Sequence, residues 1–352
     1  MTAWEKNIRR VIPYVPGEQP KETNIIKLNT NENPYDPSPR VMQKQMELSV
    51  LKKYPDPTAS ALVDALAAYH HVSNKNVFVG VGSDDVLAMS FLTFFNSTEP
   101  ILFPDITYSF YDVWADLFKI PYRTVAVDDS FKIHAKDYYG ENGGIVIANP
   151  NAPTGIAEPL SFIEDILEHN KDVVVIVDEA YVDFGGESAL ALVDKYDNLL
   201  VVRTYSKSRS MAGVRIGYAI GNEKLINYLN DVKYSYNSYT MNYPSIVLGV
   251  ESIADEDYFR ESIAKVIKTR EWFTLQIEQL GFSCPKSSTN FVFATHKSIP
   301  AKEIYEKAKE NKIIVRYFNK PRIDNYLRIT IGTQEEMQIF VDFLKKLTDE
   351  AC

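Results

Sequence analysis

Six short apolar runs between residues 77 and 202 constrain the fold more than any other feature of this sequence. They are VFVGV (77–81), ILF (101–103), RTVAV (123–127), IVIA (145–148), VVVIV (173–177) and LLVV (199–202). Helix-length segments such as Pro159–Asn170 lie between them. Strands without polar alternation are typical of a parallel sheet that is buried on both faces. The sequence therefore predicts an α/β fold with a mostly parallel sheet sandwiched by helices.

The 352 residues are too many for one ordinary domain, so we expect a large domain and a smaller one. Residues 1–37 are rich in Pro and Asn without long periodicity, and we interpret them as an N-terminal arm that belongs to the small domain. The large domain is expected over 38–243. Residues 244–352 predict a small α+β domain. Its expected elements are one long helix from about Pro244 to Leu280, a helix near 301–310, a terminal helix, and strands at 290–294, 313–317 and 326–331.

Composition excludes several classes of function. The net charge of -9 gives no general attraction for nucleic acids, so we expect none to bind. Cys284 and Cys352 are too few for a disulfide framework, and the five histidines lack metal-ligand spacing, so we expect no metal site. The start, MTAWEKNIRR, has no apolar signal core, and no run approaches the roughly 18 apolar residues of a membrane span. A cytoplasmic protein without membrane partners is expected.

Reactive side chains follow several of the predicted strands. Ligands of open parallel sheets bind beyond the carboxyl ends of the strands, where loops and helix N-termini converge. Side chains that can bind or react with a ligand follow four of the predicted strands and so reach that edge. They are Ser83 and Asp84, then Tyr108, then Asp178 and Tyr181, and finally Ser206, Lys207 and Arg215. Each has an ordinary alternative as well, since Ser and Asp cap helices, Tyr packs and most Lys are solvated.

Together these residue types match the needs of pyridoxal 5'-phosphate. A carboxylate at Asp178 can pair with a protonated pyridine nitrogen, and the amine of Lys207 can form an imine with the aldehyde and later carry a proton. A phosphate ester needs hydroxyls, backbone N–H groups and a guanidinium fork. Ser83, Ser206 and Arg215 offer these groups. Tyr108 can stack on the ring, and Tyr181 can donate to its phenolic oxygen.

The segment Arg203–Tyr218, RTYSKSRSMAGVRIGY, resembles the cofactor-lysine signature of the class-II aminotransferases, which have fold type I. Asn149–Gly155, Asp178–Tyr181 and Leu327–Gly332 follow the pattern of that family in the same order. In the arm, IPY (12–14), LNTNENP (28–34) and the pair Tyr54-Pro55 are similar to the histidinol-phosphate aminotransferase family. This resemblance implies a homodimer that converts histidinol phosphate and 2-oxoglutarate to imidazole acetol phosphate and glutamate in histidine biosynthesis. The mechanism would be ping-pong, alternating between the pyridoxal and pyridoxamine forms of the cofactor.

The resemblance also implies residue roles. Ser83, Asp84, Tyr108, Asp178, Tyr181, Ser206, Lys207 and Arg215 would surround the cofactor, with Lys207, Asp178 and Tyr181 as the catalytic set. Tyr54 would reach the cofactor phosphate of the other subunit. Arg328 would bind the substrate anion, and Arg316 with Tyr14 the substrate phosphate. One position departs from the family, because Ala152 stands where an Asn usually donates to the phenolic oxygen. Asn151, its neighbour, remains a candidate cofactor ligand.

Several alternatives stay open. Another class-II enzyme, such as an aromatic amino-acid aminotransferase or a threonine-phosphate decarboxylase, would share most of these residues. A non-catalytic regulator of this fold would need a DNA-binding module, for which the chain has neither spare length nor basic charge. The Tyr-rich segment 234–243 is predicted either to pack in a core or an interface or to contact substrate, for example through Asn237. Arg316 could also be an ordinary salt-bridge partner.

Overall fold

The computed structural model of the chain describes residues 8–22 and 24–350. The first seven residues of the MTAWEKNIRR segment, and Cys352, lie outside the described residues.

The six predicted strands form one large sheet with a seventh. Its strands are β2 (Val77–Gly80), β3 (Ile101–Pro104), β4 (Tyr122–Val125), β5 (Ile145–Ala148), β6 (Val175–Asp178), β7 (Leu199–Thr204) and β8 (Gly217–Gly221). The order across the sheet is β2-β8-β7-β6-β5-β3-β4. Only β8 runs against its neighbours, β2 and β7. The prediction of a mostly parallel sheet is confirmed, and β8 is the strand that the apolar runs did not indicate.

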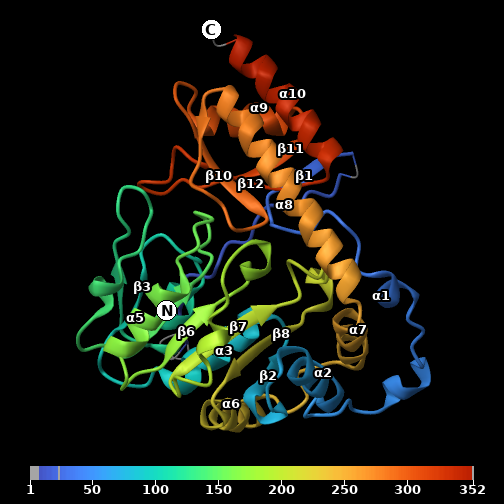
Figure 1. Ribbon diagram of the computed structural model, residues 1–352, viewed down its shortest axis with the longest axis vertical. Coiled ribbons are helices and arrows are strands. Elements are labelled where there is room, and N and C mark those ends of the chain that lie inside the picture. The colour runs from blue at the N-terminus through green and yellow to red at the C-terminus, as the bar shows by residue number, and fades with distance from the viewer. Residues whose placement is uncertain (1–7, 23, 351–352) are drawn as a thin grey trace.

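Helices cover both faces of this sheet (Figure 1). Successive residues of a strand point to opposite faces. Accordingly Val175 and Val177 of β6 belong to one apolar cluster, whereas Ile176 between them belongs to another. The first cluster includes side chains of α2 (Ser60–His70), α5 (Leu160–His169) and α7 (Tyr243–Ile253), and the second those of α3 (Ser83–Phe94), α4 (Tyr111–Phe118) and α6 (Glu223–Tyr236). The continuous apolar character of the strands follows from this double burial.

A second sheet lies in the upper part of the molecule in Figure 1. Its strands are β1 (Ile26–Leu28), β9 (Phe282–Ser283), β10 (Phe291–His296), β11 (Ile313–Tyr317) and β12 (Leu327–Thr330), in the order β1-β11-β12-β10-β9. The helices α8 (Glu256–Gln279), α9 (Ala301–Glu310) and α10 (Gln334–Glu350) pack with this sheet in a third apolar cluster, which also includes Ala152, Tyr181 and Phe184. The α+β character predicted for this region is therefore present.

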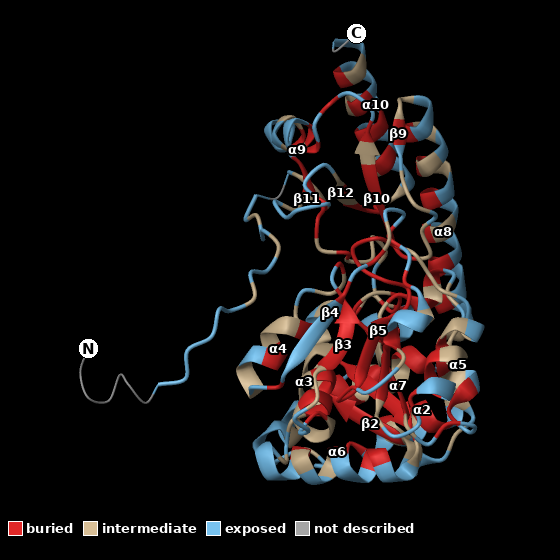
Figure 2. Ribbon diagram, turned by 90° about the vertical axis from the view of Figure 1, so that its left-hand side faces the viewer, coloured by how far each residue is buried: buried red, intermediate tan, exposed pale blue. Residues whose placement is uncertain are grey.

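The arm joins the second sheet through β1, which the sequence did not indicate. Ile26–Leu28 pairs in parallel with β11, with Ile26 opposite Ile313. Three residues carry too little periodicity to predict a strand, and their partner lies far along the chain. The described residues before β1 run as an extended segment at the left of Figure 2. Their contacts include a hydrogen bond from Arg9 to the Leu117 carbonyl, 2.6 Å.

The single helix expected from about Pro244 to Leu280 is instead two helices. The first, α7, ends at Ile253, and α8 begins at Glu256. The break lies at Asp255, whose φ of -109° and ψ of 64° are not helical. The two helices pack on different parts of the molecule, α7 against α2 and α8 against α10. The prediction of one helix was wrong because helical periodicity does not report such a change of direction.

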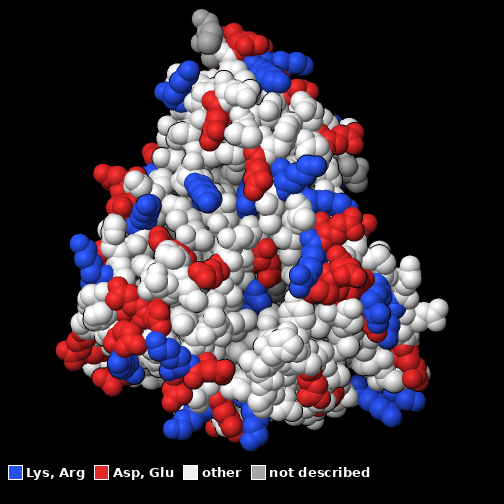
Figure 3. Space-filling model, in the orientation of Figure 1, with Lys and Arg blue, Asp and Glu red and all other residues white. Residues whose placement is uncertain are grey.

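The remaining short elements connect these layers. They are α1 (Pro39–Gln43) and the 3-10 turns η2 (Leu48–Lys52), η3 (Asn74–Asn76), η4 (Ala135–Tyr138), η5 (Val182–Phe184), η6 (Ala189–Leu192) and η7 (Ala212–Val214). Acidic and basic side chains are interspersed over the face drawn in Figure 3. Among residues 8–22 and 24–350, no helix combines the length and the apolar character needed to cross a membrane.

Candidate active site

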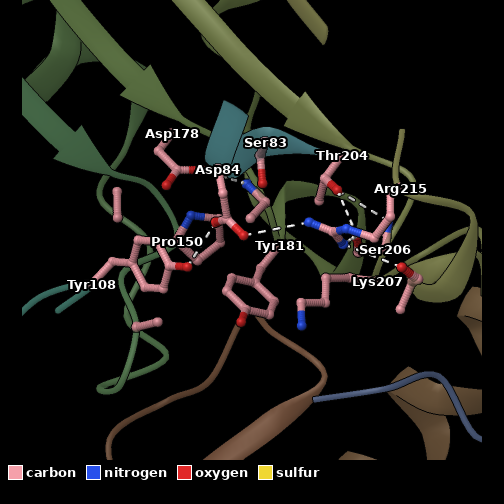
Figure 4. A pocket seen from close by; sticks show the side chains of 14 residues that line it. Ser83, Asp84, Tyr108, Pro150, Asp178, Tyr181, Thr204, Ser206, Lys207 and Arg215 are labelled. Carbon is pink, nitrogen blue, oxygen red and sulfur yellow. Dashed lines mark hydrogen bonds and ion pairs between the residues drawn. The ribbon is translucent and has the colours of Figure 1, made fainter. Parts of the chain in front are cut away.

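Two adjoining cavities, each of about 140 Å³, lie at the carboxyl edge of the large sheet. They share Tyr108, Ala152, Tyr181 and Lys207 in their walls. The first cavity, drawn in Figure 4, is further lined by Ser83, Asp84, Ala148, Pro150, Asp178, Ala180, Thr204, Ser206, Ala212 and Arg215. The second is further lined by Tyr14, Gly17, Asn29, Thr30, Asn31, Thr107, Ser109, Pro153, Arg316, Phe318 and Arg328. The structure thus gathers most of the predicted site residues around one continuous space.

One end of the first cavity has the chemistry of an anion cradle. Ser83 opens α3, so its backbone N–H points out of the helix start, where the helix dipole favours negative charge. The strand β8 lies close behind, since a Cβ at Gly217 would be 2.3 Å from the Ser83 nitrogen. Arg215 faces this point, with Nη1 3.4 Å from the Ser206 hydroxyl. These groups could hold a phosphate ester.

Asp84 links the cradle to the aromatic wall. Its carboxylate accepts a hydrogen bond from the Tyr108 hydroxyl at 2.8 Å and lies 3.4 Å from Nη2 of Arg215 (Figure 4). Burial raises the pKa of Tyr108 well above its usual value, and the charge of Asp84 raises it further. Tyr108 is therefore a neutral donor whose ring is fixed against the cavity.

Asp178 is a buried carboxylate without a basic partner in the described part of the chain. Its Oδ2 accepts from the Tyr111 hydroxyl at 2.8 Å, and its Oδ1 accepts from the Ala180 N–H at 3.2 Å. Burial raises the pKa of Asp178 to about 6, although the hydrogen bond from Tyr111 opposes that rise. A buried charge of this kind calls for a cationic ligand. Sequence reasoning missed Tyr111, three residues after Tyr108 at the start of α4.

Lys207 follows the end of β7 and faces both cavities. Its Nζ donates to the Thr30 carbonyl at 3.1 Å and lies 5.9 Å from the centre of the Tyr181 ring. The next residue, Ser208, donates to Asp183 at 2.5 Å, and Arg203 binds the same carboxylate group at 2.6 Å. The segment that carries the amine is therefore held by a partly buried ionic network.

The arm contributes to this site, which the sequence suggested only through Tyr14 and family motifs. Besides Thr30, it supplies Asn31, whose Nδ2 donates to the Tyr181 hydroxyl at 2.8 Å. Tyr14 lines the second cavity and stacks on Phe110 with ring centres 4.2 Å apart. The parallel pairing of β1 with β11 places these arm residues beside the cavities.

Two guanidinium groups face the second cavity. Arg316 and Arg328 are paired directly across β11 and β12, which places their side chains on the same face of the sheet. Neither has a carboxylate partner within the described residues, so Arg316 is not an ordinary salt-bridge residue there. Arg328 donates through Nη2 to the Asn29 carbonyl at 2.8 Å, and its buried Nε has no hydrogen-bond partner among the described residues. Burial lowers the pKa of Arg328, and the charge of Arg316 lowers it further. Such a pair would gain from binding an anion.

Asn151, a candidate cofactor ligand, lines neither cavity. The Nδ2 of Asn151 donates to the Ile106 carbonyl and to Thr154, and its Oδ1 accepts from Thr107. Both N–H groups of this amide are engaged, by Ile106 of a neighbouring loop and by Thr154, whereas Ala152 lines both cavities.

Tyr54 is 81% exposed and lines neither cavity of its own chain. It stacks on Tyr239 of the Tyr-rich segment, with ring centres 4.6 Å apart. Asn237 accepts from the Tyr239 N–H and likewise lines neither cavity. Exposed aromatic rings of this kind are available to a partner chain.

Comparison with known proteins identifies the family of this chain. The sequence model of "Aminotransferase class I and II" matches residues 23–344. The chain is 51% identical to the histidinol-phosphate aminotransferase of Lactococcus lactis subsp. lactis (strain IL1403), with 97% of this chain and 96% of the relative aligned. It is 50% identical to that of Clostridium botulinum (strain Okra / Type B1), with 99% of each chain aligned.

A solved structure shares the fold. The crystal structure of a putative histidinol-phosphate aminotransferase from Erwinia carotovora atroseptica SCRI1043 has a TM-score of 0.86 over 93% of this chain and 97% of that chain, at 24% identity. That likeness supports the fold, while the sequence match carries the family. The chain therefore belongs to the class I and II aminotransferases, which are enzymes that depend on pyridoxal phosphate.

Proposed function

We propose that this protein is a histidinol-phosphate aminotransferase, which moves the amino group of L-histidinol phosphate to 2-oxoglutarate and so forms imidazole acetol phosphate and L-glutamate in histidine biosynthesis. The observation that carries the proposal is the pair Arg316 and Arg328, which faces the same space as Lys207 without carboxylate partners in the described residues. Relatives that are about half identical over nearly the whole chain bear this name, which supports the same assignment.

The cofactor residues are proposed from the chemistry of the first cavity. Ser83, Ser206 and Arg215 would hold the phosphate, because they combine a helix N-terminus, a hydroxyl and a guanidinium. When bound, the cofactor supplies an aldehyde carbon and an electron-withdrawing pyridine ring. Asp178 would hold the protonated ring nitrogen, since its buried carboxylate needs a cation.

The remaining walls would fix the ring and its oxygen. Tyr108 would stack on the ring, with Asp84 holding its hydroxyl and also neutralising part of the charge of Arg215. Tyr181 would donate its hydroxyl hydrogen to the phenolic oxygen. Its position in the walls of both cavities supports this role.

Lys207 would hold the aldehyde carbon through its amine and move protons. Its Nζ is anchored now on the Thr30 carbonyl, a neutral acceptor that leaves the amine free to change partners. Once a substrate amine takes its place, the same Nζ can carry the proton between the substrate Cα and the cofactor carbon in both half-reactions.

The substrate would lie in the second cavity. Arg328 would bind the anionic group of whichever substrate is present, the α-carboxylate of glutamate or the phosphate of histidinol phosphate, and Arg316 with Tyr14 would bind the phosphate of histidinol phosphate. A dianionic phosphate monoester suits two adjacent guanidinium forks better than one. The buried, unpartnered Arg328 Nε and Asn29 Oδ1 offer further polar contacts to a ligand there.

Assembly, location and domain division are proposed with the activity. A homodimer in the cytoplasm would let the exposed ring of Tyr54 reach the cofactor phosphate of the other subunit. The arm 1–37 would act with the small domain over 244–352, against the large domain over 38–243. The pairing of β1 with β11 supports the first part of this division.

The test combines spectra with chemical trapping. The purified protein should be yellow, and borohydride should fix the cofactor on Lys207. Adding L-histidinol phosphate should shift the visible band at lower concentration than phenylalanine or threonine O-3-phosphate, which stand for the alternative aromatic aminotransferase and decarboxylase activities. A stronger response to either comparator would reject histidinol phosphate as the substrate. Trapping on another lysine would reject Lys207.

A further inference from the structure

We infer that Asn31 is a positioning residue, which directs the hydroxyl hydrogen of Tyr181 toward the phenolic oxygen of the cofactor and strengthens that donation. The inference rests on the proposed function, in which Tyr181 is the donor to that oxygen. It follows from a directional chain of hydrogen bonds that links β12, the arm and Tyr181.

The chain begins at Thr330 in β12. The Asn31 backbone N–H donates to the Thr330 Oγ1 at 3.0 Å, so the hydrogen of the Thr330 hydroxyl is free to point elsewhere. That hydroxyl in turn donates to Oδ1 of Asn31 at 2.9 Å. In this arrangement Oδ1 is the accepting end of the amide, and Nδ2 is the end that faces Tyr181.

The amide then fixes the role of the Tyr181 hydroxyl. Nδ2 of Asn31 donates to the Tyr181 oxygen at 2.8 Å, and an amide nitrogen cannot accept in return. Within the described residues the Tyr181 hydroxyl has no acceptor for its own hydrogen. Since Tyr181 lines both cavities, that hydrogen is available to a ligand acceptor.

The position of Asn31 is held firmly. Its backbone adopts φ of 57°, a conformation that Asn tolerates better than most residues, and the residue is 1% exposed. Its carbonyl accepts from Asn290 at 3.0 Å. The donor is thus fixed before any ligand binds.

The hydrogen bond from Asn31 to Tyr181 is important because Ala152 stands where the family usually has an Asn donor. Ala152 lines both cavities but offers no side-chain donor, and the amide of neighbouring Asn151 already donates to Ile106 and Thr154. Among these residues, Tyr181 is the one whose side chain can donate to the phenolic oxygen. A hydroxyl that accepts a hydrogen bond becomes a stronger donor, because bonds in a chain polarise one another.

The measurable consequence concerns the pKa of the imine with Lys207. A donor to the phenolic oxygen stabilises the unprotonated imine more than the protonated one, so a stronger donor lowers that pKa. Other groups that interact with Tyr181 or Lys207 are Arg328, Tyr111 and Glu32, and substituting Asn31 by glycine alters none of them chemically.

Three variants of the cofactor-loaded protein test the inference by pH titration of the visible absorbance. Tyr181→Phe should raise the imine pKa by about one unit. Asn31→Gly, which suits the backbone, should raise it by about 0.2 to 0.5 units. Asn31→Asp should raise it by at least about one unit, since a carboxylate accepts the tyrosine hydrogen and withdraws it from the cofactor.

Double variants separate the hydrogen bond from other effects. In the Tyr181→Phe background, Asn31→Gly should cause no further shift, and Asn31→Asp should keep only the smaller effect of its charge. His71→Gly is a matched control, because His71 has φ of 56° on the exposed surface, and it should leave the titration unchanged.

The outcomes distinguish two failures. If Tyr181→Phe does not shift the titration, the role of Tyr181 in the proposed function is wrong, and this inference falls with it. If Tyr181→Phe shifts the titration but both Asn31 variants match the native protein, the inference alone is overturned. Equal shifts by Asn31→Gly with and without the Tyr181 hydroxyl would also overturn it.

Discussion

Replacing Asp178 by asparagine should make the cofactor-free protein more stable and, at the same time, weaken its affinity for the cofactor. The carboxylate is buried and has no basic partner in the described residues, and burial raises its pKa from 3.8 to about 6. A change of about two pKa units corresponds to about 3 kcal/mol.

The sign follows from proton linkage. The pKa in the folded state lies above that in the unfolded state, so the folded state binds the proton more tightly. The contribution of Asp178 to stability is therefore lost as the pH rises from about 4 to about 6, and the full cost applies above that range. Asparagine keeps the shape and can still accept from Tyr111 without a charge, while its Nδ2 then faces the Ala180 N–H and that weaker hydrogen bond is lost. At pH 8 the Asp178→Asn apoprotein should gain up to about 3 kcal/mol in the free energy of unfolding.

The Asp178→Asn substitution should, by contrast, weaken binding of the cofactor. A protonated pyridine nitrogen would lose a charge-assisted hydrogen bond, and the dissociation constant should rise roughly 10- to 100-fold. Urea unfolding of both apoproteins at pH 8, followed by cofactor titration of each, measures the two changes.

Tyr111→Phe provides the control for this reasoning. In the native apoprotein it removes a hydrogen bond to a charged group and should cost about 1.5 to 3 kcal/mol, whereas in the Asp178→Asn background the bond is uncharged and its loss should cost about 1 kcal/mol. An Asp178→Asn apoprotein that is no more stable than the native one at pH 8 would refute the uncompensated buried charge.

Three further predictions concern the neighbouring subunit, the substrate and the cofactor oxygen. Dimers that combine Tyr54→Ala with Lys207→Ala protomers should regain activity at one site, and hybrids no more active than their parents would contradict a site shared between chains. Arg316→Ala should weaken histidinol phosphate by about 1.5 to 3 kcal/mol and glutamate much less, as apparent affinities from half-reaction spectra would report. Equal losses would argue against a phosphate contact. Ala152→Asn should lower the imine pKa by about one unit in a pH titration of the visible absorbance, and coincident curves would mean that the missing donor is already replaced.

Most of the large sheet could be predicted from sequence because its strands are buried on both faces. A run such as VVVIV favours a strand that is buried on both faces, and β6 ends in Asp178 at the carboxyl edge of the sheet. The order of functional residues after the strands likewise predicted which side chains would meet, since parallel strands end at one edge. Ser83, Tyr108, Tyr181, Lys207 and Arg215 do line one cavity.

Elements defined by long-range pairing escaped prediction. Strand β1 has three residues and exists because it pairs with β11, and the break at Asp255 separates helices that pack on different layers. Neither leaves a local pattern, because both are decided by contacts between distant segments. Asn151 shows a third case, where the amide is bonded to Ile106 of another loop and to Thr154, so a contact with the cofactor stays a prediction.

The sequence by itself determined the residue types that reach the sheet edge, and only the tertiary structure decided their partners. Tyr111 reaches Asp178 across 67 residues, and Asn31 reaches Tyr181 across 150. Hydrogen bonds of this kind depend on distances of about 3 Å and on which atom donates, neither of which residue spacing encodes. The hydrogen-bond partners of Asp178 and Tyr181 are therefore determined only once the arm and both sheets have packed together.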